Sequence, residues 1–104
     1  MNQTDLQSLI NDTTELPRRT TLLREDGLRT VLLHLKAGEQ IPEHQTRGAI
    51  TVQCLKGQAL FLRGEEAIQL TPALVISVPP GKLHSVSAPE DTLLLVTISE
   101  PTQS

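Results

Sequence analysis

The sequence predicts an all-β domain, either a sandwich or a barrel of short antiparallel strands. From Thr20 onward, turn signals recur about every seven to eleven residues and separate short runs of leucine and β-branched residues. No stretch in this region has helical spacing, and the 104 residues suffice for one hydrophobic core. We therefore expect one barrel over residues 20–99, an N-terminal arm over 1–19 and a frayed tail over 100–104.

The same turn signals, together with the spacing of apolar residues, predict the individual elements. Asp26-Gly27 predicts a tight hairpin between the first two strands. In the arm, the apolar residues of "LQSLI" have helical spacing after Thr4, which predicts a short helix packed on the barrel with Thr4 as its N-cap. Strands are expected near residues 20–25, 28–36, 41–46, 49–55, 58–63, 66–70, 73–78, 83–88 and 92–99.

Composition argues against several classes of partner. The net charge is −3 with scattered charges, and Phe61 is the only aromatic residue, so we expect neither a nucleic-acid partner nor an anionic membrane surface. Cys54 is the only cysteine, which excludes an intrachain disulfide. Together with the absence of a leader or a long apolar span, this leads us to expect a cytoplasmic protein.

Two histidines are the main candidates for chemistry. Side chains alternate across a strand, so alternate residues between Glu43 and Cys54 are expected to share the inward face, while Glu43 points outward. His84 follows the stiff Pro79-Pro80-Gly81 turn, which aims the next strand, and Val86 shares its direction. The expected ligand-binding set from these segments is His44, Thr46, Ile50, Val52, Cys54, His84 and Val86.

The same alternation leads to expectations for Arg63, His34 and Cys54. Arg63 shares the parity of Phe61, so both are expected in the pocket, with Arg63 at the barrel mouth to meet an anionic ligand. The alternative for Arg63 is an exposed arginine at the end of the strand. His34 lies opposite its apolar neighbours on the strand and is expected to have no role in the pocket. Cys54 is expected to be a small buried hydrophobe rather than a nucleophile.

These residues carry a resemblance to the cupins. The first cupin motif is Gly, five residues, His, one, His, three or four, Glu, six, Gly; the second is Gly, five residues, Pro, one, Gly, two, His, three, Asn. The resemblance covers Gly38 to roughly Ile98, and it implies an RmlC-like jelly roll, a double-stranded β-helix of two antiparallel sheets. The matching positions are Gly38, His44, Gly57, Pro79, Gly81 and His84.

The departures from the motifs concern the metal ligands. In metal-binding cupins three histidines and the glutamate hold the ion, and of these only His44 and His84 match here. Thr46 stands for the second histidine and Ile50 for the glutamate. We therefore expect a degenerate site with no firmly held cofactor and at most a weakly bound divalent metal on the two histidines. Ala73 and Ala88 replace the glycine and asparagine of the second motif.

Three functions remain open at this point. The first is binding of a small organic ligand through His44 and His84, acting as hydrogen-bonding or acid–base groups. The second is a metal-dependent enzyme, a dioxygenase or isomerase, and the third is a non-catalytic effector-binding or dimerisation module. A homodimer is also expected, because Leu60, Leu62 and the segments "TLLLVTI" and "LRTVLLHL" look apolar on both faces.

Overall fold

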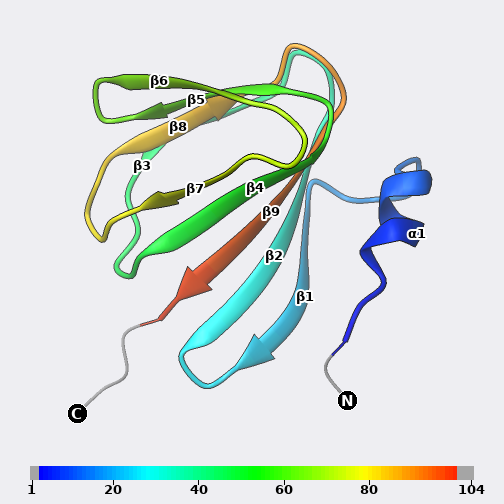
Figure 1. Ribbon diagram of the computed structural model, residues 1–104, viewed down its shortest axis with the longest axis horizontal. Helices are drawn as coiled ribbons and strands as arrows, with labels where there is room; N and C mark the ends of the chain where they lie inside the picture. Colours follow the sequence, from blue (N-terminus) through cyan, green and yellow to red (C-terminus); the bar gives the residue numbers. More distant parts are fainter. Residues whose placement is uncertain (1–2, 101–104) are drawn as a thin grey trace.

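The computed structural model describes residues 3–100, which form two antiparallel β-sheets and one short N-terminal helix (Figure 1). The jelly-roll architecture expected from the sequence is confirmed. The elements are α1 (Leu6–Asn11), β1 (Arg19–Glu25), β2 (Leu28–Leu35), β3 (Gln40–His44), β4 (Ile50–Lys56), β5 (Ala59–Arg63), β6 (Glu66–Leu70), β7 (Val75–Val78), β8 (His84–Ser87) and β9 (Thr92–Ser99).

The sheets pair strands that are distant in the sequence. One sheet has the order β1-β2-β9-β4-β7 and the other the order β3-β8-β5-β6. In Figure 1 the four-stranded sheet lies above the five-stranded sheet. The core fills the space between them with the inward residues of alternating strands, as the burial of β4 at every second residue illustrates. Its buried members are Leu35, Ile50, Val52, Cys54, Ala59, Phe61, Leu70, Val78, Val86, Ala88, Leu94 and Val96.

All nine expected strands are present, with bounds that differ by no more than a few residues. The hairpin prediction is also confirmed, because Glu25 pairs with Leu28 across the turn and Gly27 has a φ of 76°. The tail beyond Glu100 lies outside the described residues. Glu100 itself donates its backbone N–H to the carbonyl oxygen of Gly27 at 2.9 Å.

The N-terminal helix is present, but its predicted cap was wrong. Asp5, not Thr4, is the N-cap, and its carboxylate accepts a hydrogen bond from the backbone N–H of Gln7 at 3.0 Å. The N-cap residue directly precedes the first helical residue so that its side chain reaches the second or third N–H, and Thr4 is one position too early. No residue of α1 is fully buried, although Leu6, Leu9 and Ile10 are half-buried. No helix within residues 3–100 is long and apolar enough to cross a membrane.

The N-terminal arm crosses the outer side of the five-stranded sheet. His34, Leu93 and Lys56 lie in one row across β2, β9 and β4. His34 bridges the carbonyl oxygen of Leu16 (3.2 Å) and a carboxylate oxygen of Asp91 (2.7 Å), while Lys56 donates to the carbonyl oxygen of Ile10 (3.4 Å). The arm is thus fastened at both ends of the row, and it explains why Leu93 is fully buried on this side.

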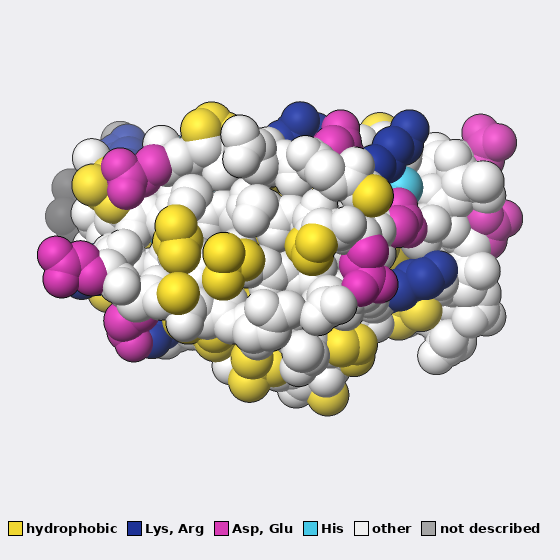
Figure 2. Space-filling model, turned by 90° about the horizontal axis from the view of Figure 1, so that it is seen from above, with side chains coloured by type: hydrophobic (Ala, Val, Ile, Leu, Met, Phe, Trp, Pro, Cys, Tyr) yellow, Lys and Arg dark blue, Asp and Glu magenta, His cyan; other side chains and the backbone are white. Residues whose placement is uncertain are grey.

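The position of the arm removes one reason to expect a dimer, namely that the outer side of β2 and β9 is apolar and uncovered. The apolar outer side of β2 and β9 is covered, at the level of Leu93, by the chain's own arm. The other sheet keeps Leu60 and Leu62 each 40% exposed, opposite Ser87 and Ser85 of β8. Figure 2, seen from above the view of Figure 1, shows hydrophobic side chains in the middle of one face and charged groups around its edges. The homodimer stays a prediction, and a monomer by light scattering at micromolar concentration would overturn it.

The backbone at Ala73 offers a test of the turn before β7. Ala73 has a φ of 78°, a left-handed conformation that disfavours any side chain with a Cβ, and it stands where the cupin motif has glycine. We expect Ala73→Gly to raise the free energy of unfolding by about 0.5–1 kcal/mol in urea titrations, because it removes this strain. The matched control is Gly38→Ala, which we expect to lower it by about 1 kcal/mol.

The control isolates the backbone, since a Cβ on Gly38 would meet no heavy atom within 4 Å at its φ of 89°. A lower stability of Ala73→Gly would contradict the assignment of strain to this turn.

Candidate functional site

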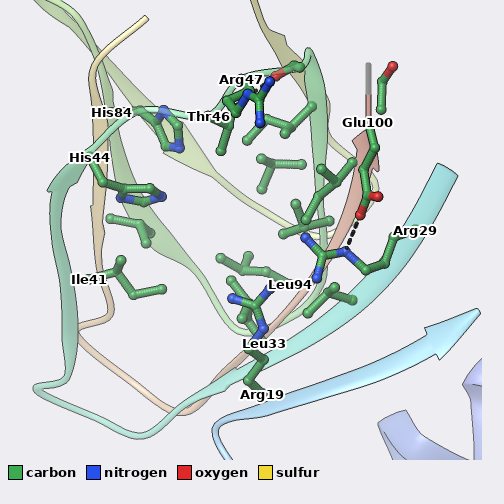
Figure 3. A pocket seen from close by; sticks show the side chains of 18 of the residues that line it. Arg19, Arg29, Leu33, Ile41, His44, Thr46, Arg47, His84, Leu94 and Glu100 are labelled. Carbon is green, nitrogen blue, oxygen red and sulfur yellow. Dashed lines mark hydrogen bonds and ion pairs between the residues drawn. The ribbon is translucent and has the colours of Figure 1, made fainter. Parts of the chain in front are cut away.

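A cavity of about 480 Å³ opens between the two sheets (Figure 3). This volume is in the range of small-molecule sites, roughly 300–1,000 Å³. Its floor is apolar and is built by inward residues of both sheets, whereas its histidines and arginines lie around it. The apolar lining consists of Val31, Leu33, Ile41, Ile50, Val52, Phe61, Val86, Leu94, Val96 and Ile98.

His44 and His84 lie side by side on one wall of this cavity. They are directly paired across β3 and β8, and their ring centroids are 4.2 Å apart at an interplanar angle of 61°. The two rings are therefore close enough to contact one small ligand. Their matching inward parity predicts two rings that face each other across the barrel interior. Instead they are neighbours in the same sheet, because their strands are hydrogen-bonded to each other.

A bulge in β3 turns His44 inward. Ile41 pairs with Val86 and His44 with His84, so three steps along β3 match two along β8. Strict alternation would put residues three apart on opposite faces, but both Ile41 and His44 line the cavity. The extra residue falls at Pro42–Glu43, and a proline without an N–H is well tolerated in a bulge.

Backbone carbonyls fix the tautomer of both rings. Nδ1 of His44 lies 3.0 Å from the carbonyl oxygen of Pro42, and Nδ1 of His84 lies 2.9 Å from that of Lys82. A carbonyl oxygen only accepts, so each Nδ1 donates, and the neutral ring then carries its lone pair on Nε2. Within residues 3–100 neither Nε2 has a hydrogen-bond partner. The wall thus presents two adjacent imidazole acceptors.

His84 is the more constrained of the two rings. It is 4% exposed, and Phe61 stacks on it with centroids 5.7 Å apart and planes 11° from parallel. Burial lowers the pKa of His84 below its ordinary value of 6.5, and the nearby His44 lowers it further, against the opposing effect of the hydrogen bond to Lys82. His84 is therefore neutral at pH 7, which keeps its Nε2 lone pair available.

The Pro79-Pro80-Gly81 turn links the strands that carry the pair. Gly81 has a φ of 76°, and its N–H donates to the carbonyl oxygen of Thr46 at 2.9 Å. This bond ties the segment before β8 to the segment after β3. The hydroxyl of Thr46 lines the cavity while donating to the carbonyl oxygen of Gly48 at 2.9 Å.

The structure brings seven of the nine expected ligand-binding residues to the cavity. His44 and His84 form one wall, and the others contribute to its lining: Thr46, Ile50, Val52, Phe61 and Val86. Cys54 and Arg63 do not line it, which corrects their assignment.

Cys54 is buried in the core next to the cavity rather than in it. It has no exposed surface, and its Sγ lies 3.6 Å from the carbonyl oxygens of both Lys56 and Gly57. Burial raises the pKa of the Cys54 thiol, an effect larger than that of its backbone hydrogen bond. Cys54 is a small core hydrophobe, which agrees with the expectation that it is buried rather than a nucleophile.

The guanidinium of Arg63 is paired with a carboxylate of its own hairpin, Glu66, which the alternation of side chains did not predict. It pairs with Glu66 across the β5–β6 hairpin and donates to that carboxylate at 3.0 and 3.2 Å, and to the carbonyl oxygen of Ser77 at 2.8 Å. The hydrogen bond from Arg63 lowers the pKa of Glu66. Arg63 thereby joins the two sheets at one end of the barrel, and its guanidinium is not available to a ligand in the cavity.

Other arginines take the place expected for Arg63. Arg19, Arg29 and Arg47 line the cavity together with Glu100, and Figure 3 shows the guanidinium groups of Arg19 and Arg29 directed into it. A signal for Arg29 was present, because it shares the parity of Val31, Leu33 and Leu35 on its strand. Arg19 lies at the very start of β1 and carried no such signal.

The donor set does not fit a cupin metal cage. Two imidazoles can ligate, but the two remaining cage positions hold Thr46 and Ile50, whose side chains are respectively a poor ligand and no ligand for a divalent cation. Within residues 3–100 no group of three or more His, Cys, Asp and Glu side chains is placed to share an ion. The one carboxylate of the lining, Glu100, lies against Arg29 instead, with Nε to Oε1 at 3.0 Å.

Comparison with known proteins identifies the fold. A protein of Thermus thermophilus shares 26% identity over 97% of this chain and 100% of its own, with a TM-score of 0.78. An RmlC-like cupin from Desulfovibrio desulfuricans shares 26% over 81% and 82% of the two chains, with a TM-score of 0.72. A cupin superfamily protein from Desulfitobacterium hafniense shares 23% over 80% and 76%, with a TM-score of 0.76.

The chain thus has the RmlC-like cupin fold, as its two motifs indicated. Neither the family profiles nor the curated protein sequences searched give a match.

The lowered pKa of His84 predicts a pH dependence of stability. Between the folded pKa and 6.5 the unfolded chain binds more protons, so the contribution of His84 to stability is constant above pH 6.5 and declines as the pH falls through that value toward the folded pKa. We expect NMR titration to give His84 a pKa below 6.5, and His44→Ala to raise it, since water then reaches the ring and a neighbouring charge is lost.

The matching expectation for unfolding is that His84→Gln flattens the decline in urea midpoint between pH 8 and pH 5.5. A His84 pKa at or above 6.5 would show that the ring is not desolvated in the folded protein.

Proposed function

We propose that this cupin binds a small organic ligand in its cavity, with the Nε2 atoms of His44 and His84 as adjacent hydrogen-bond acceptors and without a firmly held metal. The observation that supports this most directly is the pair of backbone-anchored rings, each with a free Nε2 on one cavity wall. A hydroxyl or N–H of a ligand satisfies these lone pairs. The apolar floor then holds the carbon skeleton by burial.

The same pair is suited to move a proton. Histidine titrates near neutrality, so a neutral ring with a free Nε2 accepts a proton from a bound O–H or acidic C–H group and returns it later. His44 and His84 differ in this respect, because His84 is held neutral by burial while His44 is exposed to the cavity and solvent. His84, which burial holds neutral, is therefore suited to be a fixed acceptor of a hydrogen bond.

Binding of a probe alcohol tests the role of the pair. We expect α,ω-hexanediol, an apolar chain with a hydroxyl at each end, to shift the NMR resonances of cavity residues in a saturable way. His44→Ala and His84→Ala should each weaken this binding by roughly three- to tenfold, the loss of one neutral hydrogen bond. Lys36→Gln, an exposed position outside the lining, is the control and should leave this binding unchanged. Saturable binding that is unchanged in both histidine variants would contradict the proposal.

A gain of metal affinity tests the missing ligands. Thr46→His together with Ile50→Glu adds an imidazole and a carboxylate beside His44 and His84, and should raise zinc affinity by orders of magnitude in calorimetric titrations. The gain should fade below about pH 6, where protons compete for the imidazoles. The matched control, Thr46→His with Ile50→Gln, has the same shape but lacks the carboxylate and should gain less.

The unmodified protein provides the opposing outcome. If it retained one divalent metal per chain through dialysis against a chelator, the metal-dependent alternative would replace our proposal, since His44 and His84 would then have ligating partners outside this set.

A further inference from the structure

Positive charge is concentrated at the cavity of an acidic chain. Three of the nine lysine and arginine residues line the cavity, but only one of the twelve aspartate and glutamate residues does. The three arginines and Glu100 give the lining a net charge of +2, whereas the whole chain has −3. A cleft with one sign of charge and apolar walls attracts ions of the opposite sign.

The arginines are largely unsatisfied by the protein. Within residues 3–100, Arg19 and Arg47 have no hydrogen-bond or ion-pair partner, in contrast to Arg18, which donates to the carbonyl oxygen of Gln40, and to Arg63. Arg29 lies 3.0 Å from Glu100, yet its buried Nε is not aligned for a hydrogen bond with any group. The lining therefore offers several guanidinium donors that a ligand can use.

We infer that the ligand is an amphipathic organic carboxylate, an extension that rests on the proposed function of the histidine pair. Its carboxylate is bound by guanidinium donors of the lining, which Arg19, Arg29 and Arg47 supply, its apolar body lies on the aliphatic floor, and a hydroxyl meets the histidine pair. Figure 3 shows the arrangement: His44 and His84 lie on one side of the cavity and the arginines around the remainder.

A carboxylate fits these donors better than a phosphate does. Phosphate sites commonly use a helix N-terminus or a glycine-rich loop. The only helix within residues 3–100, α1, contributes no residue to the cavity lining. The lining contains one glycine of the described residues, Gly48. Planar guanidinium groups bind either anion in a two-pronged geometry, and they do so for a carboxylate without such a loop. The predominantly aliphatic lining also favours an anion with a hydrocarbon body.

Four probes that share one hydrocarbon chain separate these contacts. They are ω-hydroxyhexanoate, with both groups; hexanoate, with the carboxylate alone; α,ω-hexanediol, without the carboxylate; and hexyl phosphate. We expect ω-hydroxyhexanoate to bind most tightly and hexanoate to bind more tightly than the diol, by roughly tenfold for a charge-assisted hydrogen bond. Raising the salt concentration should weaken the two carboxylates and leave the diol unchanged.

Single variants assign the effect to the arginines. Arg19→Gln and Arg47→Gln should each weaken hexanoate by roughly tenfold without changing the diol. Lys36→Gln is the matched control, since it removes the same charge from an exposed position outside the lining. Glu100→Gln should tighten hexanoate, because it frees Arg29 from its carboxylate neighbour.

The outcomes distinguish the two proposals. If hexanoate and the diol bind equally and neither responds to the arginine variants, the carboxylate is wrong while the histidine pair stands. If hexyl phosphate binds tightly and hexanoate does not, the anion is a phosphate and our inference fails. If hexanoate responds to the arginines but the diol ignores the histidine variants, the anion site stands and the proposed role of the histidines fails. If no probe binds, both fail.

Discussion

The pairing of β8 with β3 on one side and β5 on the other is the constraint on which the site depends. It sets His84 opposite His44 in one ladder and opposite Arg63 in the other, and it brings Phe61 onto the face of His84. Nδ1 of each histidine then lies within hydrogen-bond distance of the carbonyl oxygen two residues earlier in the chain, at Pro42 and Lys82. A slip of one residue in β8 would turn His84 outward and undo the pair, the stacking and the tautomer together.

The five-stranded sheet contributes a different chemistry to the same cavity. Its inward residues are aliphatic along the middle of β2 and β9 and become charged toward one end, where Arg29 and Glu100 continue the inward parity of their strands. The histidines come from the opposing sheet. The cavity therefore has imidazoles on one wall and guanidinium groups elsewhere around an aliphatic lining.

The sequence predicted the strands and the histidine pair well, for local reasons. Turn residues and period-two alternation are local signals, and they placed nine strands and seven cavity residues. The errors came from contacts between distant segments. The bulge that admits Ile41 is set by pairing with β8, the partner of Arg63 by the β5–β6 hairpin and β7, and the cover over Leu93 by an arm from far earlier in the chain. Alternation alone could not assign these, because each depends on what lies across from the strand.

One position contributes both to the incomplete metal cage and to the positive charge of the cavity. Ile50 stands where a metal-binding cupin has glutamate, and it is 5% exposed in the cavity wall. A glutamate there would reduce the net charge of the lining from +2 to +1 and would give the nearby cations a partner inside the protein. Isoleucine removes both the ligand and the competing carboxylate. In the function we propose, isoleucine at this position suits the cavity to an anion, and its aliphatic side chain extends the surface on which the body of that anion rests.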